Sequence, residues 1–464
     1  MSFSYDSTND IFVMFGGTPT GFNVDSVDET WIYDPIANTL LVAGYGDVDL
    51  ATGVPSQSSV QPRVGFAYRV GSKTVLRGGY ALSSWVGRFG FTGGTLSTQF
   101  PVIYNVQNGV QNDSIVDGTF SSLPPISFVS IPSNGRISPA PNQGFFVIPT
   151  HNPLPTIQTY NLTLQRQLGG GMTLDVAYVG NLGRQLPNNR ELNAAAPGTG
   201  TAGLPLKAAF GRDASTSLRG PGVNSNYNAL QTVLTRRFSS GISFQASYSW
   251  SKSIDEGSNQ PGFIDNLDVR RQYGPSDFDQ THLLTISHVL ESPFGKGKPF
   301  LSGGGKAAAI LGGWQLNGIY RFATGTPFTA IADSTACNCP GNTNYADVAG
   351  PLNILGGIGP GQPWVSPASF AVPGPNRFGN AGRNTIRGPH LNNYDLSLFR
   401  TFAMGERFKL EMRGEAYNLA NSPHFTNPSG NTGGNISSAN FGIITSTLNG
   451  YGNRQVQVAA RLLF

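Results

Sequence analysis

Apolar and polar residues alternate with a period of two along many short stretches of this sequence. Because successive side chains of a β-strand point to opposite faces, each such stretch predicts a strand with one apolar and one polar face. The clearest stretch lies near the C-terminus, where one face consists of Phe408, Leu410, Met412, Gly414 and Ala416. The other face carries five charged residues, Arg407, Lys409, Glu411, Arg413 and Glu415. The pattern indicates an all-β protein.

Eleven stretches of this kind follow one another after residue 60. They cover residues 61–70, 74–82, 156–167, 172–181, 226–237, 241–253, 280–291, 313–332, 392–402, 406–420 and 453–464. Short turns at 71–73, 168–171, 239–241 and 403–405 mostly alternate with long Gly-, Asn-, Pro- and Ser-rich loops at 83–155, 182–225, 254–279, 333–391 and 421–452. The link at 292–312 falls on the short-turn side although it is longer.

Two folds share this alternation. In a soluble sandwich the charged face would be solvated, whereas in a transmembrane barrel it would line the interior and the apolar face would contact lipid. Long loops without periodicity are uncommon in compact soluble domains, but outer-membrane barrels combine short periplasmic turns with long extracellular loops. We therefore expect a transmembrane antiparallel β-barrel, a partial one of about 11–12 strands. Its lumen-facing charges would be the five residues given above.

Composition supports this expectation and argues against a nucleic-acid-binding protein and against a helical membrane protein. Charged residues make up 12% of the chain, 60 residues are Gly and 32 are Pro. The net charge is only +4 and no basic run occurs, which argues against nucleic acid as a partner. No stretch of about 20 apolar residues predicts a membrane helix. The first residues, MSFSYDSTNDIF, lack the basic and apolar regions of a signal peptide, so none is expected in this chain.

The final strand, NRQVQVAARLLF, ends on an aromatic residue. Its apolar face consists of Val456, Val458, Ala460, Leu462 and Phe464. Aromatic residues also stand where a membrane interface would lie, with Tyr248 and Trp250 toward the long-loop end of one strand and Trp314 at the short-turn end of another.

Several segments together resemble a known family. They are QPRVGFAYRVGSKTVLRGGYAL, NYNALQTVLTRRFSSGISFQASYSWSKSID, GPSDFDQTHLLTISHVLESPFGKGK, GGWQLNGIYRFATGTPFTA and FKLEMRGEAYNLANSPHF, which look like the C-terminal barrel of Oar-like TonB-dependent outer-membrane receptors. The resemblance covers residues 60–464 and implies a Gram-negative outer-membrane protein that imports a bulky, unidentified ligand. It implies outer-membrane lipid and the barrel assembly machinery as partners, the latter reading the apolar face that ends at Phe464. A TonB complex would be a partner only if the missing plug and TonB-contact motif were supplied.

Residues 1–41 follow a different pattern. Ile11–Phe15 precede Gly16–Gly17, and the motif TWIYDP follows at 30–35, which looks like a single kelch repeat. We therefore expect an orphan kelch-like β segment at 1–41, a linker or extra strand at 42–60, and the receptor-like barrel at 61–464. The alternative is that the first segment supplies one or two further barrel strands.

Candidate chemistry is sparse, and no catalytic motif, cofactor or metal site is expected. Cys337 and Cys339 stand two apart and form either a local disulfide or two free thiols. His282 and His288 share a strand face but are too far apart for one metal, roughly 20 Å, so hydrogen-bonded roles are expected. Six acidic residues cluster around one long loop and suggest either a calcium loop or a solvated surface: Asp255, Glu256, Asp265, Asp268, Asp277 and Asp279.

The sequence thus leaves three functions open. The first is an outer-membrane receptor or transporter barrel, present here as a C-terminal fragment. The second is a surface-exposed adhesion or binding β-protein, and the third is a fragment without independent activity. None of the three is an enzyme.

Overall fold

The computed structural model describes residues 60–84, 141–147, 153–258, 265–405, 407–428 and 434–464. It also describes the backbone of five short strands, Ser2–Asp6 (β1), Ile11–Phe15 (β2), Thr30–Asp34 (β3), Thr39–Ala43 (β4) and Arg136–Ile137 (β7), which form a sheet in the order β1-β2-β3-β4-β7. β4 is paired with β3 and β7 there, not with a strand of the larger sheet. The expected kelch-like segment and domain boundaries remain predictions.

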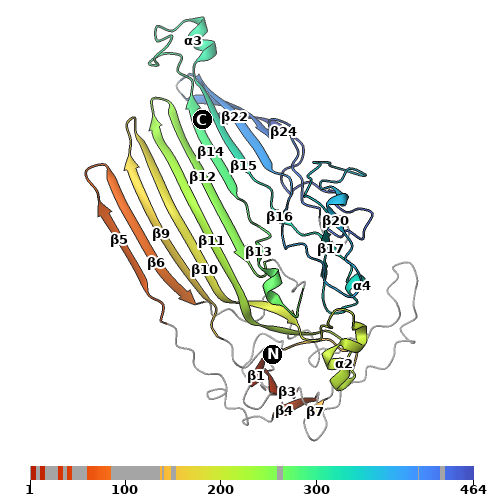
Figure 1. Ribbon diagram of the computed structural model, residues 1–464. Coiled ribbons are helices and arrows are strands. Elements are labelled where there is room, and N and C mark those ends of the chain that lie inside the picture. Colours follow the sequence, from red (N-terminus) through yellow and green to blue (C-terminus); the bar gives the residue numbers. More distant parts are fainter. Residues whose placement is uncertain are drawn as a thin grey trace, which may run out of the picture.

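The larger sheet contains eleven strands that are neighbours in chain order, each antiparallel to the next (Figure 1). They are β5 (Arg63–Arg69), β6 (Thr74–Ser84), β9 (Thr156–Gln167), β10 (Met172–Glu191), β11 (Thr216–Ser239), β12 (Ile242–Asp255), β14 (His282–Glu291), β15 (Trp314–Ala323), β22 (Leu391–Met404), β23 (Phe408–Tyr417) and β24 (Gln455–Leu463). Two short strands attach to it, β8 (Phe145–Val147) beside β11 and β13 (Gly274–Pro275) beside β12. All eleven predicted strands are present.

Three of the predicted bounds are clearly wrong. β10 continues well past residue 181, and β11 begins well before residue 226. The two backbones stay paired, with register shifts after Gly183, through residues that were expected in a loop. The strand expected over 313–332 ends at Ala323, and its remainder forms two short loop strands, β16 (Pro327–Phe328) and β17 (Ile331–Ala332). A proline cannot donate to a ladder, which fits the early end of β15.

The two ends of the sheet differ as the link lengths predict. At one end the strands are joined by tight turns and by the link that carries α3 (Lys306–Leu311) (Figure 1). The opposite end carries the long connections, which hold the short helices α2 (Pro205–Phe210) and α4 (Ser334–Cys337) (Figure 1). Among the described helices, none has the length and apolar composition needed to cross a membrane.

Among the described strands the sheet is open, because β5 and β24 each have only one neighbour strand there. Both edge strands run toward the short-turn end, since an eleventh strand in an antiparallel series is parallel to the first. The C-terminus accordingly lies at that end of the sheet (Figure 1).

One face of the sheet is apolar across all eleven strands and is not covered by a second layer of the described residues. Its exposed side chains include Val64 at 67%, Trp250 at 56%, Met412 at 43% and Val458 at 78%. Soluble monomers rarely leave so large a contiguous apolar surface in water. The sandwich alternative required these residues to be buried, and they are not.

The long connections fold into a compact layer at their end of the sheet. Short strand pairs hold it, in which β16 pairs with β21 (Ile386–Arg387), β17 with β18 (Asn344–Tyr345), and β19 (Asp347–Val348) with β20 (Phe370–Ala371). Its small core packs Phe328, Tyr345, Val365, Ile386 and Phe441, with Trp364 at the margin. The best-buried apolar side chains of the described chain therefore lie in this loop layer, as expected if the sheet itself contacts lipid.

Candidate functional site

The charged row of β23 lies on the polar face of the sheet. Arg413 is the centre of a row of ion pairs, with Glu411 at 3.3 Å and Glu415 at 3.7 Å. Its guanidinium also lies 4.5 Å from the centre of the Phe399 ring of β22. Glu415 further accepts hydrogen bonds from Ser397 and from Gln457 of β24. A row of alternating charges on one face is suited to contact water or a polar partner.

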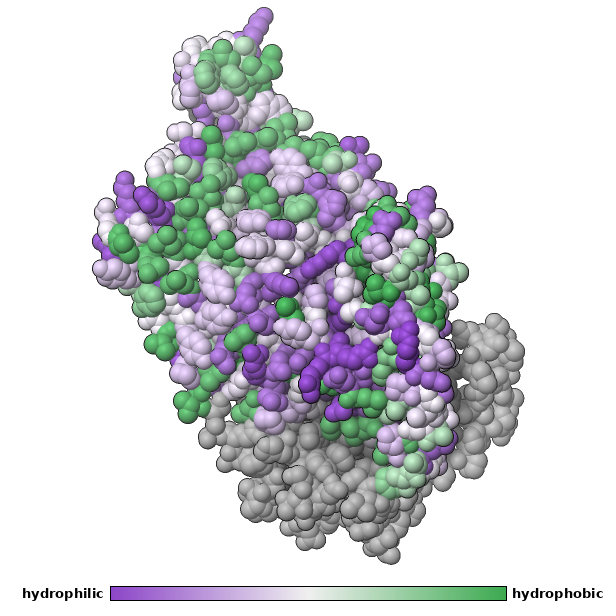
Figure 2. Space-filling view, in the orientation of Figure 1, coloured by the Kyte–Doolittle hydropathy of each residue, from purple (hydrophilic) through white to green (hydrophobic). Residues whose placement is uncertain are grey.

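The same face is hollowed between β12, β14, β15 and β22. The hollow has a volume of about 700 Å³, and its lining mixes polar side chains, among them Gln245, Ser287, Asn317, Asp395 and Ser397, with apolar ones such as Val289 and Ile319. Figure 2 shows a separate gathering of hydrophilic residues in the middle of the view, toward the long-loop end of the sheet, and hydrophobic ones over the strands above it. The polar lining extends the charged row of β23 into one surface.

The C-terminal strand places its apolar residues on the other face. β24 pairs with β23 so that Val458 lies opposite Gly414 and Ala460 opposite Met412. Val456 is 67% exposed, Leu462 50% and Phe464 91%. Val456, Val458, Ala460 and Leu462 therefore share a face with the apolar side of β23, and Phe464 directly follows the strand.

Half of the acidic cluster is buried, and for those three residues the structure corrects the expectation of a solvated loop. Asp255, Asp265 and Asp279 are each at most 5% exposed. Arg383, itself 6% exposed, donates to Asp255 at 2.6 Å and to Asp277 at 3.0 Å. Burial is compatible with charge here because each buried carboxylate has a guanidinium partner.

Two further arginines complete the network. Arg387 pairs with Asp279, and Arg271 pairs with Asp265 at 3.1 Å. The arginines were missed at the sequence level because Arg383 and Arg387 lie more than a hundred residues from their acidic partners. The signal available was the coincidence of six acids around one loop and several arginines in another.

Protonation in the loop layer follows burial and pairing. Tyr345 donates its hydroxyl to the carbonyl of Arg271, and burial raises the pKa of Tyr345 to about 12. The hydrogen bond from Arg377 lowers the pKa of Asp347. Burial lowers the pKa of His424, and His390 nearby lowers it further.

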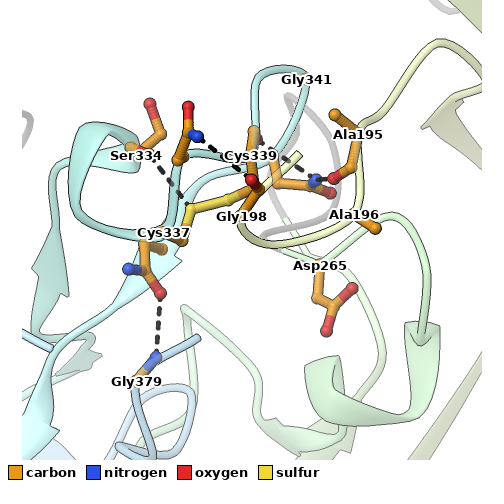
Figure 3. The surroundings of a disulfide bond; sticks show 12 residues. Ala195, Ala196, Gly198, Asp265, Ser334, Cys337, Cys339, Gly341 and Gly379 are labelled. Carbon is orange, nitrogen blue, oxygen red and sulfur yellow. Dashed lines mark hydrogen bonds between the residues drawn. A yellow bond between two sulfur atoms is a disulfide. The ribbon is translucent and has the colours of Figure 1, made fainter. Parts of the chain in front are cut away.

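The two cysteines form a disulfide, which resolves the alternative left by the sequence. It closes a loop that docks on residues 195–200 (Figure 3). The backbone N–H of Gly198 donates to the carbonyl of Cys337 at 2.8 Å, and Asn342 donates to the carbonyl of Ala195 at 3.0 Å. The disulfide therefore lies where two loops are held together by hydrogen bonds, which indicates a structural role.

The strand histidines have the hydrogen-bonded roles expected of them. His282 shares a hydrogen bond with Tyr248, and His288 shares one with Tyr394, both at 2.8 Å. Within the described ranges, no three His, Cys, Asp or Glu side chains are grouped so that they could hold a metal ion.

The geometry defines a class of protein: an antiparallel all-β sheet whose apolar face is suited to lipid and whose polar face is suited to an aqueous interior. The family of the outer membrane beta barrel domain matches residues 6–457, nearly the whole chain, and the protein belongs to that family. The predicted fold class is confirmed, although the barrel is not closed.

Solved structures with similar folds are outer-membrane transporters and receptors. The transporter YddB from Escherichia coli has a TM-score of 0.45 and 9% identity, covering 98% of this chain and 45% of YddB. The siderophore receptor PiuA from Acinetobacter baumannii has a TM-score of 0.41 and 8% identity, covering 97% of this chain and 39% of PiuA. The FrpB iron transporter from Neisseria meningitidis has a TM-score of 0.41 and 9% identity, covering 98% of this chain and 42% of FrpB. The chain spans less than half the length of these structures. No curated protein matches its sequence.

Proposed function

We propose that this chain forms part of the wall of an Oar-like TonB-dependent receptor, which takes up a bulky ligand through its long extracellular loops. The observation that carries the proposal is the open sheet of eleven antiparallel strands, whose two edge strands have no outer neighbour in the described part of the chain and both run toward the short-turn end. The sequence resemblance over residues 60–464 supports the Oar-like type.

The direction of the edges limits what can close the barrel. Direct pairing of β5 with β24 would be parallel, and so would both seams of a ring made from two copies of this sheet. Antiparallel closure needs an odd number of additional strands. Free edges cannot persist in hydrocarbon, because lipid offers no partner to their N–H and C=O groups. We infer that the missing wall comes from a polypeptide that contributes an odd number of strands.

In this proposal the charged row contacts the plug or lines the permeation route. Arg407, Lys409, Glu411, Arg413 and Glu415 then face the lumen, while the apolar face ending at Phe464 is read by the barrel assembly machinery. The TonB complex is a partner only when a separate segment supplies the plug and the TonB-contact motif.

Complementation tests the proposal. The chain, exported behind an added signal peptide, is produced with and without a segment carrying the plug and early strands of an Oar-like receptor. We expect a heat-modifiable outer-membrane complex only when both pieces are present. Phe464→Ser should reduce its amount several-fold, whereas Leu463→Ser, on the opposite face, should not. If the chain alone stays monomeric without detergent and binds cells, the adhesion alternative is correct instead.

A further inference from the structure

A second hollow lies on the apolar side of the sheet, at the long-loop ends of β10, β11 and β12. It has a volume of about 800 Å³. Its strand side is formed by Tyr178, Leu230 and Trp250, which are 47%, 39% and 56% exposed, and its loop side includes Asn384 and Arg387. The hollow therefore has an apolar wall on the sheet and a polar rim on the loops.

The polar rim coincides with the expected edge of the bilayer. Tyr178 donates its hydroxyl to Asn228 at 2.6 Å, and Tyr160 donates to the same oxygen at 3.2 Å. Tyr and Trp rings with one apolar and one polar side are typical of the level of lipid headgroups. Trp250, Tyr178 and Tyr160 thus mark the headgroup level on the outer side of the sheet.

Two cations border the hollow at this level. Lys252 lies two residues beyond Trp250 on the same face of β12, is exposed, and is in no ion pair with any acid of the described chain. Arg387 is 37% exposed and pairs with Asp279, which is buried at 1%. The accessible charge at the rim is therefore positive, and Lys252 is its uncompensated part.

We propose that this hollow binds a phosphorylated lipid of the outer leaflet, with the phosphate at Lys252 and the acyl chains against Tyr178, Leu230 and Trp250. A cation above an apolar wall matches a molecule that carries an anion above hydrocarbon chains. A soluble phosphate would use the cation but leave the three apolar side chains without a partner. The site is separate from the polar lumenal face and does not depend on the ligand transported.

The test measures lipid bound to the full chain in neutral detergent, with native mass spectrometry as the readout and the β-sheet signal in far-ultraviolet circular dichroism as the check on folding. The probes are lipid A and lipid A from which the phosphates have been removed. Loss of a charge-assisted contact predicts that Lys252→Gln lowers lipid A binding about tenfold. Lys73→Gln, a lysine in a short turn at the other end of the sheet, is the matched control and should bind as the wild type does.

A second variant distinguishes the contribution of the acyl chains to binding from that of the phosphorylated headgroup. Trp250→Ala should weaken binding of both lipids, because the ring contacts the acyl chains, whereas Lys252→Gln should affect the phosphorylated lipid alone. Equal binding by wild type and Lys252→Gln would overturn the proposal, as would an equal loss in Lys73→Gln. Complete displacement of lipid A by inorganic phosphate would also overturn it, since that identifies a site for the soluble anion. These outcomes do not depend on whether the complementation experiment succeeds.

Discussion

Arg383 connects parts of the chain that are far apart in sequence. Its guanidinium donates to the carboxylate of Asp255 at the end of β12, to Asp277, and to the hydroxyl of Ser258 at 2.6 Å. Both Arg383 and Asp255 are less than 10% exposed. Removing one partner of a buried pair leaves the other charge buried without compensation, which is why such substitutions are costly.

We expect Arg383→Gln to destabilise the loop layer by about 3–5 kcal/mol. Arg377→Gln is the matched control, because Arg377 pairs with Asp347 but is 51% exposed, and a surface pair contributes at most about 1 kcal/mol. Hydrogen exchange of the loop amides in the folded protein measures the difference. Equal protection in the two variants would show that the buried network does not hold the loops.

His424 gives the loop layer a dependence on pH. It is 5% exposed, and burial lowers its pKa. The unfolded loop, with an ordinary histidine pKa of about 6.5, binds more protons than the folded one just below that value. Stability is therefore complete above about pH 6.5 and falls as the pH drops toward the lowered pKa of the folded state.

Hydrogen exchange around His424, corrected for the intrinsic pH dependence of exchange, should show less protection at pH 5.5 than at pH 7.5. The amide of His424 bonds to Tyr451 and that of Leu448 bonds to His424, so both amides report on this region. The His424→Gln variant should lose this dependence. An unchanged slope in the variant would assign the effect to another group.

At the scale of elements, the alternation of apolar and polar residues predicted the strands but not how the long loops pack together. The bounds of β9 agree with the prediction at both ends because its alternation is regular and a short turn follows it. The extra length of β10 and β11 was not predictable from period alone, since it depends on pairing between two irregular segments, with a bulge near Leu186. The Arg383–Asp255 contact was hidden for the same reason: a period describes neighbours along one strand, not partners from separate loops.

Close packing between strands makes a further prediction on the apolar face. Gly180 of β10 lies opposite Tyr160 of β9, whose ring occupies the space that a Cβ at position 180 would need. Gly414 of β23, on the same face, has no atom within 4 Å of such a Cβ. We expect Gly180→Leu to destabilise the folded protein by about 1–3 kcal/mol through overpacking.

Gly414→Leu, its control, should be neutral. Urea unfolding of the complemented protein in lipid vesicles, followed by gel migration of the folded band, compares the two variants. Equal midpoints would mean that the ring of Tyr160 moves aside without cost.

At the scale of the whole molecule, the described chain combines an uncovered apolar sheet face with a well-packed loop layer. A water-soluble protein concentrates its apolar burial in the middle of its sheets, whereas here, among the described residues, a cluster of buried apolar side chains lies among the loops. This distribution is the one expected when lipid, not a second protein layer, covers the sheet. It also explains why free edges and an odd strand number matter more for this protein than for a soluble one.

The central claim is that one face of the strands contacts hydrocarbon and the other faces water. Spin labels on single cysteines placed in turn at positions 409 to 414 of β23, in the complemented protein in lipid vesicles, test it most directly. Leu410, Met412 and Gly414 should give labels accessible to oxygen dissolved in the bilayer, and Lys409, Glu411 and Arg413 labels accessible to a water-soluble nickel complex. Labels that show no alternation, or that shield the even positions from both reagents, would contradict the account.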